Sequence, residues 1–141
     1  MTTEAILYTD GASRGNPGPA AVGVVLADSA GNVLETARRY VGRETNNRAE
    51  YLALIQGLEL ARQRDLKSVR CYLDSELVVL QMQGAYRVRN ARLLPLHERA
   101  RALCATFERC VFHHVARELN KLADQLANQA IDEHEGRRPA S

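Results

Sequence analysis

The sequence lacks several features that would place it in a specialised class of protein. Its 141 residues include no tryptophan and only 5% aromatic residues, and the net charge is +2. No apolar stretch approaches the ~18 residues that a membrane-spanning helix requires. A charge this small excludes a polycation that coats nucleic acid indiscriminately, so any basic binding surface must be local. The length fits a single globular domain with a sizeable core.

Cysteine is also scarce, with Cys71, Cys104 and Cys110 as the only three. An odd number without a CxxC pair or the spacing of a disulfide framework favours reduced thiols, with a Cys104–Cys110 disulfide as the less favoured alternative. The first ten residues, MTTEAILYTD, have no basic segment before an apolar one and do not resemble a secretion signal. We therefore expect a cytoplasmic protein without membrane association.

Three short runs rich in β-branched residues occupy the first third of the chain. They cover residues 4–10, 20–28 and 32–42, and turns containing Gly and Asn separate them. Such runs are typical of consecutive antiparallel strands. Residues 29–32 form a connection of hairpin length between the second and third runs. A longer loop rich in glycine and proline joins the first two.

Helical patterns alternate with two further strands in the rest of the chain. Residues 45–65 contain good helix formers, no proline, and a Thr or Asn that can cap the helix. The other expected elements are a strand at 67–74, helices at 75–84 and 91–108, a strand at 110–116 and a helix at 120–134. This order predicts an α/β fold, a mixed sheet with helices on both faces. We expect one domain over residues 1–134 and a disordered tail over residues 135–141.

Four acidic residues occupy positions where apolar or turn residues are usual. Asp10 and Asp74 end the first and fourth predicted strands. Glu50 lies within an apolar stripe of its predicted helix, and Asp124 lies at the edge of the stripe of the last helix. Taken singly, an Asp at a strand end is also explained as a turn residue or as a helix cap.

The four acids can form one site if the first and fourth strands are neighbours and the first helix packs on that face. Three carboxylates then converge, and the last helix can add the fourth. Such a cluster raises the pKa of its members, and hard divalent cations usually neutralise it. Oxygen ligands without a Cys/His cluster favour Mg²⁺ or Mn²⁺ over zinc. Two such ions ~3.5–4 Å apart activate a water and stabilise the leaving oxygen in phosphodiester hydrolysis. The pattern therefore indicates a nuclease.

Four stretches of the sequence are distinctive as a set: YTDGASRGNPGP, TNNRAEYLAL, YLDSELVV and LNKLADQLAN. In order and spacing they resemble the four motifs of the type 1 ribonuclease H family. The resemblance implies a five-stranded mixed sheet in the order 3-2-1-4-5. It also implies endonucleolytic cleavage of the RNA strand of RNA/DNA hybrids with two Mg²⁺ or Mn²⁺ ions, leaving 5′-phosphate and 3′-hydroxyl ends. The metal-binding positions of the family fall on Asp10, Glu50, Asp74 and Asp124.

The resemblance also implies which residues contact the substrate. Amide side chains of the family meet 2′-hydroxyls and base edges in the minor groove of the hybrid, and a separate pocket holds a phosphate of the DNA strand. The matching residues are Asn16, Asn46 and Asn47 for the minor groove, and Arg43, Thr45 and Asn90 for the phosphate pocket. Helix capping is the alternative role of the asparagines.

Three features depart from the family pattern. Many bacterial members carry a basic, tryptophan-containing protrusion that binds the hybrid, whereas the corresponding segment here, GAYRVRNARL, is brief. Tyr86 and the arginines near it either replace part of that binding surface or form a solvated basic turn. The mobile histidine of the family has no clean counterpart. Arg117, Glu118 and His114 are the alternatives, and we favour Arg117 for substrate phosphate positioning or product release. Glu76 stands where relatives often have Gln, in a minor-groove contact.

Other functions stay open on the sequence alone. A binding module with an inactive centre is disfavoured because all four acids are present, and a structural protein would show no metal dependence. A nearer alternative is a nuclease of the wider superfamily that acts on double-stranded RNA or DNA junctions. The partner that we expect is an RNA/DNA hybrid, and no obligate protein partner is inferred.

Overall fold

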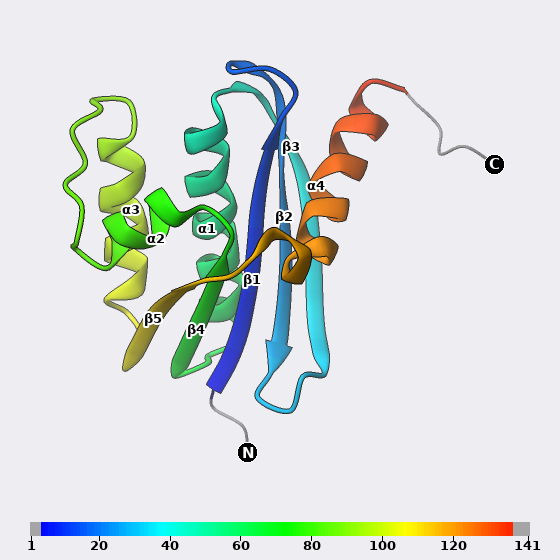
Figure 1. The fold of residues 1–141 in the computed structure, drawn as a ribbon. Helices are drawn as coiled ribbons and strands as arrows, with labels where there is room; N and C mark the ends of the chain where they lie inside the picture. Colours follow the sequence, from blue (N-terminus) through cyan, green and yellow to red (C-terminus); the bar gives the residue numbers. More distant parts are fainter. Residues whose placement is uncertain (1–3, 137–141) are drawn as a thin grey trace.

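The computed structural model describes residues 4–136, which are built around a five-stranded sheet in the order β3-β2-β1-β4-β5 (Figure 1). The strands are β1 (Glu4–Ser13), β2 (Gly18–Asp28), β3 (Val33–Glu44), β4 (Ser68–Leu73) and β5 (Arg109–His114). β1, β2 and β3 pair antiparallel, whereas β4 pairs parallel with both β1 and β5. The predicted mixed sheet and its strand order are confirmed.

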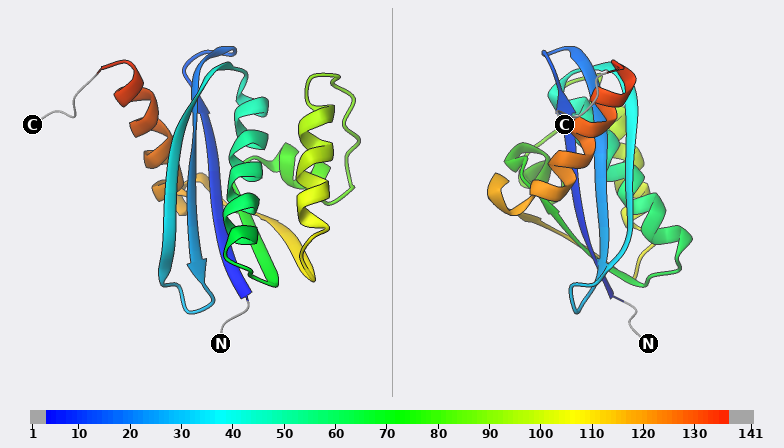
Figure 2. Two further views of the ribbon diagram at one scale, coloured as in Figure 1. Left: turned by 180° about the vertical axis from the view of Figure 1, so that it is seen from behind. Right: turned by 90° about the vertical axis from the view of Figure 1, so that its right-hand side faces the viewer.

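Helices cover both faces of this sheet. They are α1 (Asn46–Gln63), α2 (Glu76–Met82), α3 (Leu94–Cys104) and α4 (Lys121–His134), with a short 3-10 helix η1 (Arg117–Leu119) before α4. The first three helices lie on one side of the sheet and α4 lies on the other, as the views from behind and from the side show (Figure 2). Within residues 4–136, no helix has the length and apolar character needed to cross a membrane.

Local sequence signals set the helix boundaries. The side-chain oxygen of Thr45 accepts the N–H of Arg48 at 3.3 Å and caps α1, and Ser75 caps α2 in the same way. α3 is shorter than the predicted helix over residues 91–108. It begins at Leu94 because Pro95, which has no N–H to donate, fits the first turn.

The first two strands are longer than predicted. Both continue into the glycine- and proline-rich segment, because residues 10–13 pair with residues 20–23 across the ladder. Asp10 therefore lies within β1, three residues before its end, and not at the end of the strand as predicted. Its partner across the ladder is Gly23 of β2.

Two apolar layers hold the helices against the sheet. The larger layer lies under α1, α2 and α3 and includes the fully buried Leu7 and Leu54. Small residues dominate under α4. A Cβ on Gly23 would lie 1.9 Å from the carbonyl oxygen of Ala123, so glycine is required for α4 to approach β2 this closely. Since Ala123 precedes Asp124, this contact sets the position of the last acid.

Candidate active site

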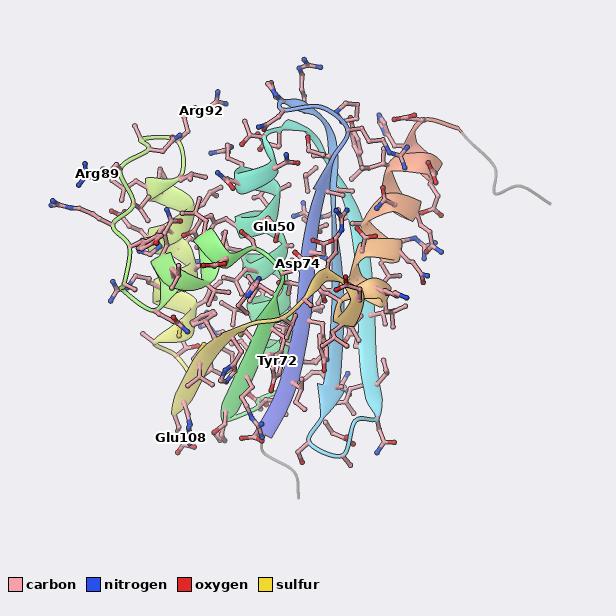
Figure 3. The ribbon with its side chains drawn as sticks, viewed as in Figure 1. Glu50, Tyr72, Asp74, Arg89, Arg92 and Glu108 are labelled. Carbon is pink, nitrogen blue, oxygen red and sulfur yellow. The ribbon has the colours of Figure 1, made fainter. Side chains whose placement is uncertain are left out.

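Four acidic side chains come together where β1, α1, the end of β4 and the start of α4 meet. Carboxylate oxygens of Asp10, Glu50 and Asp74 lie within 4.8 Å of one another. Asp124 lines the same cavity, whose volume is about 330 Å³. Figure 3 shows Glu50 of α1 and Asp74 after β4 converging on one region beside β1. The convergence expected from the sequence is therefore present.

Backbone geometry places each acid. β4 pairs parallel with β1 so that Thr9 lies opposite Leu73, and the next residues along the two strands are Asp10 and Asp74. Glu50 lies early in α1, and the backbone N–H of Gly11 donates to its Oε1 at 3.2 Å. Asp124 is in the first turn of α4. Each acid is held by a different element, so the cluster depends on the whole fold.

Burial and mutual repulsion raise the pKa values of Asp10, Glu50 and Asp74. Asp10 is 4% exposed and Glu50 is 7% exposed. Burial raises the pKa of Asp10 well above its usual range, and the charge of Glu50 raises it further. The pKa of Glu50 is also raised, mainly by burial. Burial raises the pKa of Asp74 too, although a hydrogen bond from Asn120 and the charge of Arg117 act in the opposite direction. Without a cation, the cluster retains protons that free carboxyl groups lose.

The donor set fits a hard divalent cation. Oε2 of Glu50 is buried and has no hydrogen-bond partner among residues 4–136. A buried polar atom usually has a partner, and a bound cation would provide one. Carboxylate oxygens are ligands that Mg²⁺ and Mn²⁺ prefer. Within the described part of the chain, Asp10, Glu50 and Asp74 form the one group of three or more His, Cys, Asp or Glu close enough to share an ion.

Arg117 lies at the edge of the acidic cavity. Its Nη2 is 3.8 Å from Oδ1 of Asp124, and its side chain is 79% exposed. Glu118 and His114, the two alternatives for the role of a mobile group, are both exposed and do not line the cavity. Of the three residues, the structure therefore brings Arg117 to the acids.

The expected substrate residues gather in and beside the acidic cavity. Asn46 and Asn47 line it, and the N–H of Asn46 donates to Oδ1 of Asn16 at 3.0 Å. A second cavity of about 220 Å³ shares Asn47 with the first. Its lining includes Asn16, Thr45, Asn47, Arg48, Asn90 and Arg92. Arg43 lines neither cavity and is exposed on β3.

Helix capping was the alternative role expected for the asparagines. Thr45 is the N-cap of α1, so capping is not the role of Asn46 or Asn47. Asn90 uses its Oδ1 to accept the N–H of Arg92 at 2.8 Å. Its Nδ2 has no hydrogen-bond partner among the described residues.

Two residues of this region were missed in the sequence. Arg48 donates to Oε1 of Glu44 at 3.0 Å and to the carbonyl oxygen of Arg92. It therefore links α1 to the loop before α3, on the side of the second cavity. Asn120 is 2% exposed and donates from Nδ2 to the carbonyl oxygen of Thr9 at 2.9 Å. Its position four residues before Asp124 was a usable signal, because residues four apart share a helix face.

The loop between α2 and α3 carries the basic residues that depart from the family pattern. Tyr86 is 54% exposed, and Arg89 lies on the outer side of the loop, away from Glu50 and Asp74 (Figure 3). Arg92 lines the second cavity. Glu76 is the exposed first residue of α2 and does not line the acidic cavity. None of Tyr86, Arg89, Arg92 and Glu76 lines the acidic cavity.

Comparison with known proteins assigns the chain to a family. Residues 8–130 match the reverse transcriptase-like family. A ribonuclease H of Marinobacter nauticus is 33% identical, over 96% of this chain and 99% of that protein. The chain belongs to the ribonuclease H family. This ribonuclease H-family chain is also 44% identical to ribonuclease HI of Halobacterium salinarum, over 89% of its own length.

Solved structures agree with this assignment. The crystal structure of LC11-RNase H1, isolated from compost, in complex with an RNA/DNA hybrid superimposes with a TM-score of 0.89 at 43% identity, covering 93% of this chain and 99% of that one. Some relatives are longer: the ribonuclease H-family chain spans 63% of the H. salinarum protein and 35% of its mycobacterial relatives.

Proposed function

We propose that this protein is a metal-dependent endonuclease that hydrolyses the RNA strand of RNA/DNA hybrids and leaves 5′-phosphate and 3′-hydroxyl ends. The observation that carries the proposal is the convergence of oxygens of Asp10, Glu50 and Asp74 within 4.8 Å, with Asp124 at the same cavity. Membership of the ribonuclease H family and the similarity to an RNase H1 bound to a hybrid support the choice of substrate.

The four acids would hold two Mg²⁺ or Mn²⁺ ions. When bound, such ions supply a nucleophilic water and stabilise the leaving oxygen. The chain contributes buried carboxylate ligands. Asp10 and Glu50 are almost fully removed from water, which strengthens their attraction to a cation. Because the pKa values of both acids are raised, a cation that binds here displaces a proton.

The two neighbouring cavities suit the two strands of the substrate. We assign Asn16, Asn46 and Asn47 to the 2′-hydroxyls and minor groove of the RNA-bearing strand, because amides donate and accept hydrogen bonds there. Thr45 and Asn90, in the second cavity, would hold a phosphate of the DNA strand. Since Asn47 lines both cavities, the proposed phosphate site for the DNA strand is adjacent to the acidic cavity.

Two arginines complete the assignment. Arg43, exposed on β3 just before the cap of α1, would approach the same DNA phosphate from outside the cavity. Arg117 would contact a phosphate of the substrate or product, because its guanidinium is exposed and lies beside Asp124. The loop with Tyr86 would add non-specific contacts to the backbone.

We also propose that residues 1–134 form one catalytic domain that works in the cytoplasm. All described elements pack on one sheet, and α4 ends at His134. Cys71, Cys104 and Cys110 are free thiols, as suits a reducing compartment. The expected tail begins as a turn at residues 135 and 136, and residues 137–141 lie outside the described part of the chain.

A panel of labelled substrates tests the proposed function. An RNA/DNA hybrid, an RNA duplex, a DNA duplex and single-stranded RNA are incubated with the protein and either Mg²⁺ or Mn²⁺. The proposal predicts that the RNA strand of the hybrid is cut far faster than any other strand, and that a chelator stops the reaction. Equal cleavage of the RNA duplex, or cleavage of DNA, would favour the wider superfamily alternative.

A further inference from the structure

A chain of polar contacts joins the turn after β1 to Asp124. Asn128, one helical turn after Asp124, donates from Nδ2 to the carbonyl oxygen of Asp124 at 3.0 Å and to its carboxylate Oδ1 at 3.3 Å. Arg14 donates from Nη2 to Oδ1 of Asn128 and to its carbonyl oxygen, both at 3.3 Å. The carboxylate of Asp124 is therefore connected, through Asn128, to the turn between β1 and β2.

Arg14 determines which way the Asn128 amide faces. A guanidinium can only donate hydrogen bonds, so the amide end that faces Arg14 must be the oxygen. The NH₂ end then faces Asp124, where it donates to an acceptor. A reversed amide would bring its oxygen against the carboxylate of Asp124 and its NH₂ against Arg14, which costs both hydrogen bonds.

Arg14 itself is held by α4. Its Nη1 lies 2.7 Å from Oδ1 of Asp132, one turn beyond Asn128, and its side chain is 29% exposed. The same turn of the chain carries Asn16, whose side-chain oxygen accepts the N–H of Asn46. The turn thus joins the start of α1 to the middle of α4.

The carboxylate of Asp124 is less enclosed by the protein than those of Asp10 and Glu50. Its side chain is 30% exposed, whereas Asp10 and Glu50 are buried. Arg117, 3.8 Å from Oδ1, pulls on the carboxylate from the solvent side. Asn128 also contacts Oδ1, so both interactions fall on one oxygen and leave Oδ2 for a cation.

We propose that Asn128 and Arg14 are positioning residues, which set the orientation of the Asp124 carboxylate for cation binding. The inference rests on the proposed function, in which Asp124 is a metal ligand. Groups that orient metal ligands through hydrogen bonds contribute about 10- to 100-fold to metal affinity or activity. A purely structural role, stabilising α4 and its contact with the turn, would instead change only the stability of the fold.

A set of variants separates the two roles. They are Asn128→Ala, Arg14→Gln, the double variant, and Gln129→Ala as a control on the exposed neighbouring position of α4. For each, calorimetry without substrate gives the Kd for Mn²⁺, thermal unfolding gives the Tm, and hybrid cleavage gives the dependence of rate on Mg²⁺ concentration. Binding is measured well below the Tm of the least stable variant.

The proposal predicts that Asn128→Ala weakens Mn²⁺ binding about tenfold and raises the Mg²⁺ concentration needed for cleavage. Arg14→Gln should have the same effect to a smaller degree. The double variant should be no worse than Asn128→Ala, because Arg14 acts through Asn128, and Gln129→Ala should match the wild type.

Two results would overturn the inference while leaving the proposed function intact. One is a Mn²⁺ Kd in Asn128→Ala that equals that of the wild type while the Tm falls. The other is additive effects of the two substitutions, which would mean that Arg14 and Asn128 act separately. A wild-type protein that cuts no hybrid but shows the expected pattern of Mn²⁺ affinities would keep the positioning role and remove the proposed activity. A wild-type protein that binds no Mn²⁺ would overturn both.

Discussion

The backbone N–H of Gly11 donates to Oε1 of Glu50 at 3.2 Å, which joins the strand and the helix that carry the first two acids. A Cβ at residue 11 would lie 2.2 Å from the backbone carbon of Ala49, so only glycine lets α1 cross β1 here. Glu50 is thereby held beside Asp10. Close backbone packing at Gly11 fixes this arrangement, so single acid-to-amide changes should alter the chemistry without altering the fold.

The first prediction concerns the stability of Asp10→Asn. Without metal, the pKa of Asp10 is raised in the folded state, so the folded protein binds more protons than the unfolded chain and loses stability as pH rises above the usual range of an Asp. The amide has the same shape and no charge. We expect the free energy of unfolding at neutral pH, with a chelator present, to rise by about 1–3 kcal/mol, equivalent to about one to two pKa units.

Urea unfolding measures this change, with Asp65→Asn as the control. Asp65 is exposed and has a φ of 56°, a conformation that Asn tolerates equally well. A loss of stability in Asp10→Asn would show that the carboxylate is not repelled by its neighbours.

Cation affinity should depend on pH. Because burial and repulsion raise the pKa of Asp10 and Glu50, a cation must displace protons at neutral pH, and affinity should increase as pH rises from about 6 to 8. Calorimetric Mn²⁺ titrations in two buffers of different ionisation enthalpy measure the released protons directly. An affinity independent of pH, with no proton release, would mean that the acids are already ionised.

Arg117→Ala should lower kcat more than it raises KM, by about tenfold. The guanidinium lies beside Asp124 and its charge lowers the pKa of Glu50 and Asp74, so its removal should also shift the rising limb of the pH–rate profile to higher pH. Steady-state cleavage of a hybrid across pH measures both effects. Glu118→Gln, on the same 3-10 helix, is the control. Equal behaviour of the two variants would mean that Arg117 has no role in the reaction.

A buried polar group under α1 should matter for stability alone. The hydroxyl of Tyr51 donates to Oε1 of Gln81 at 2.6 Å and lies 3.2 Å from Nδ1 of His97. Tyr51→Phe leaves both partners unpaired in the core, so we expect a loss of about 1–3 kcal/mol in the free energy of unfolding. Chemical denaturation checks this, with the exposed Tyr86→Phe as the control. A drop in cleavage rate larger than the loss of folded protein would contradict a stability role.

Local patterns in the sequence predicted a mixed sheet with helices on both faces and singled out the four acids, because an acid in an apolar stripe is conspicuous. The strand order followed only from the resemblance to the ribonuclease H family. Local patterns were insufficient where long-range contacts decide. Asp10 was expected at the end of a strand, yet pairing with β2 continues past it. That pairing joins residues of two separate runs, from Gly11 with Val22 to Ser13 with Ala20, so neither run alone reveals it.

Support for the acids was the hardest part to predict. The contact of Arg14 with Asn128 spans 114 positions and depends on how closely α4 docks at Gly23. Arg43 and Arg48 illustrate the same limit. Both lie near the start of α1 in the sequence, but Arg48 lies in α1 and lines the second cavity, whereas Arg43 lies on β3 and does not.

Cleavage of a hybrid by the wild type and by Asp10→Asn, compared at one Mg²⁺ concentration, tests the central claim most directly. Both strands carry different end labels, so the strand that is cut and its new ends are read from one gel. If the four carboxylates hold catalytic cations, the wild type should cut only the RNA strand, and the control Asp65→Asn should cut it equally well. The folded Asp10→Asn variant should cut neither strand. Undiminished RNA cleavage by Asp10→Asn would contradict the account.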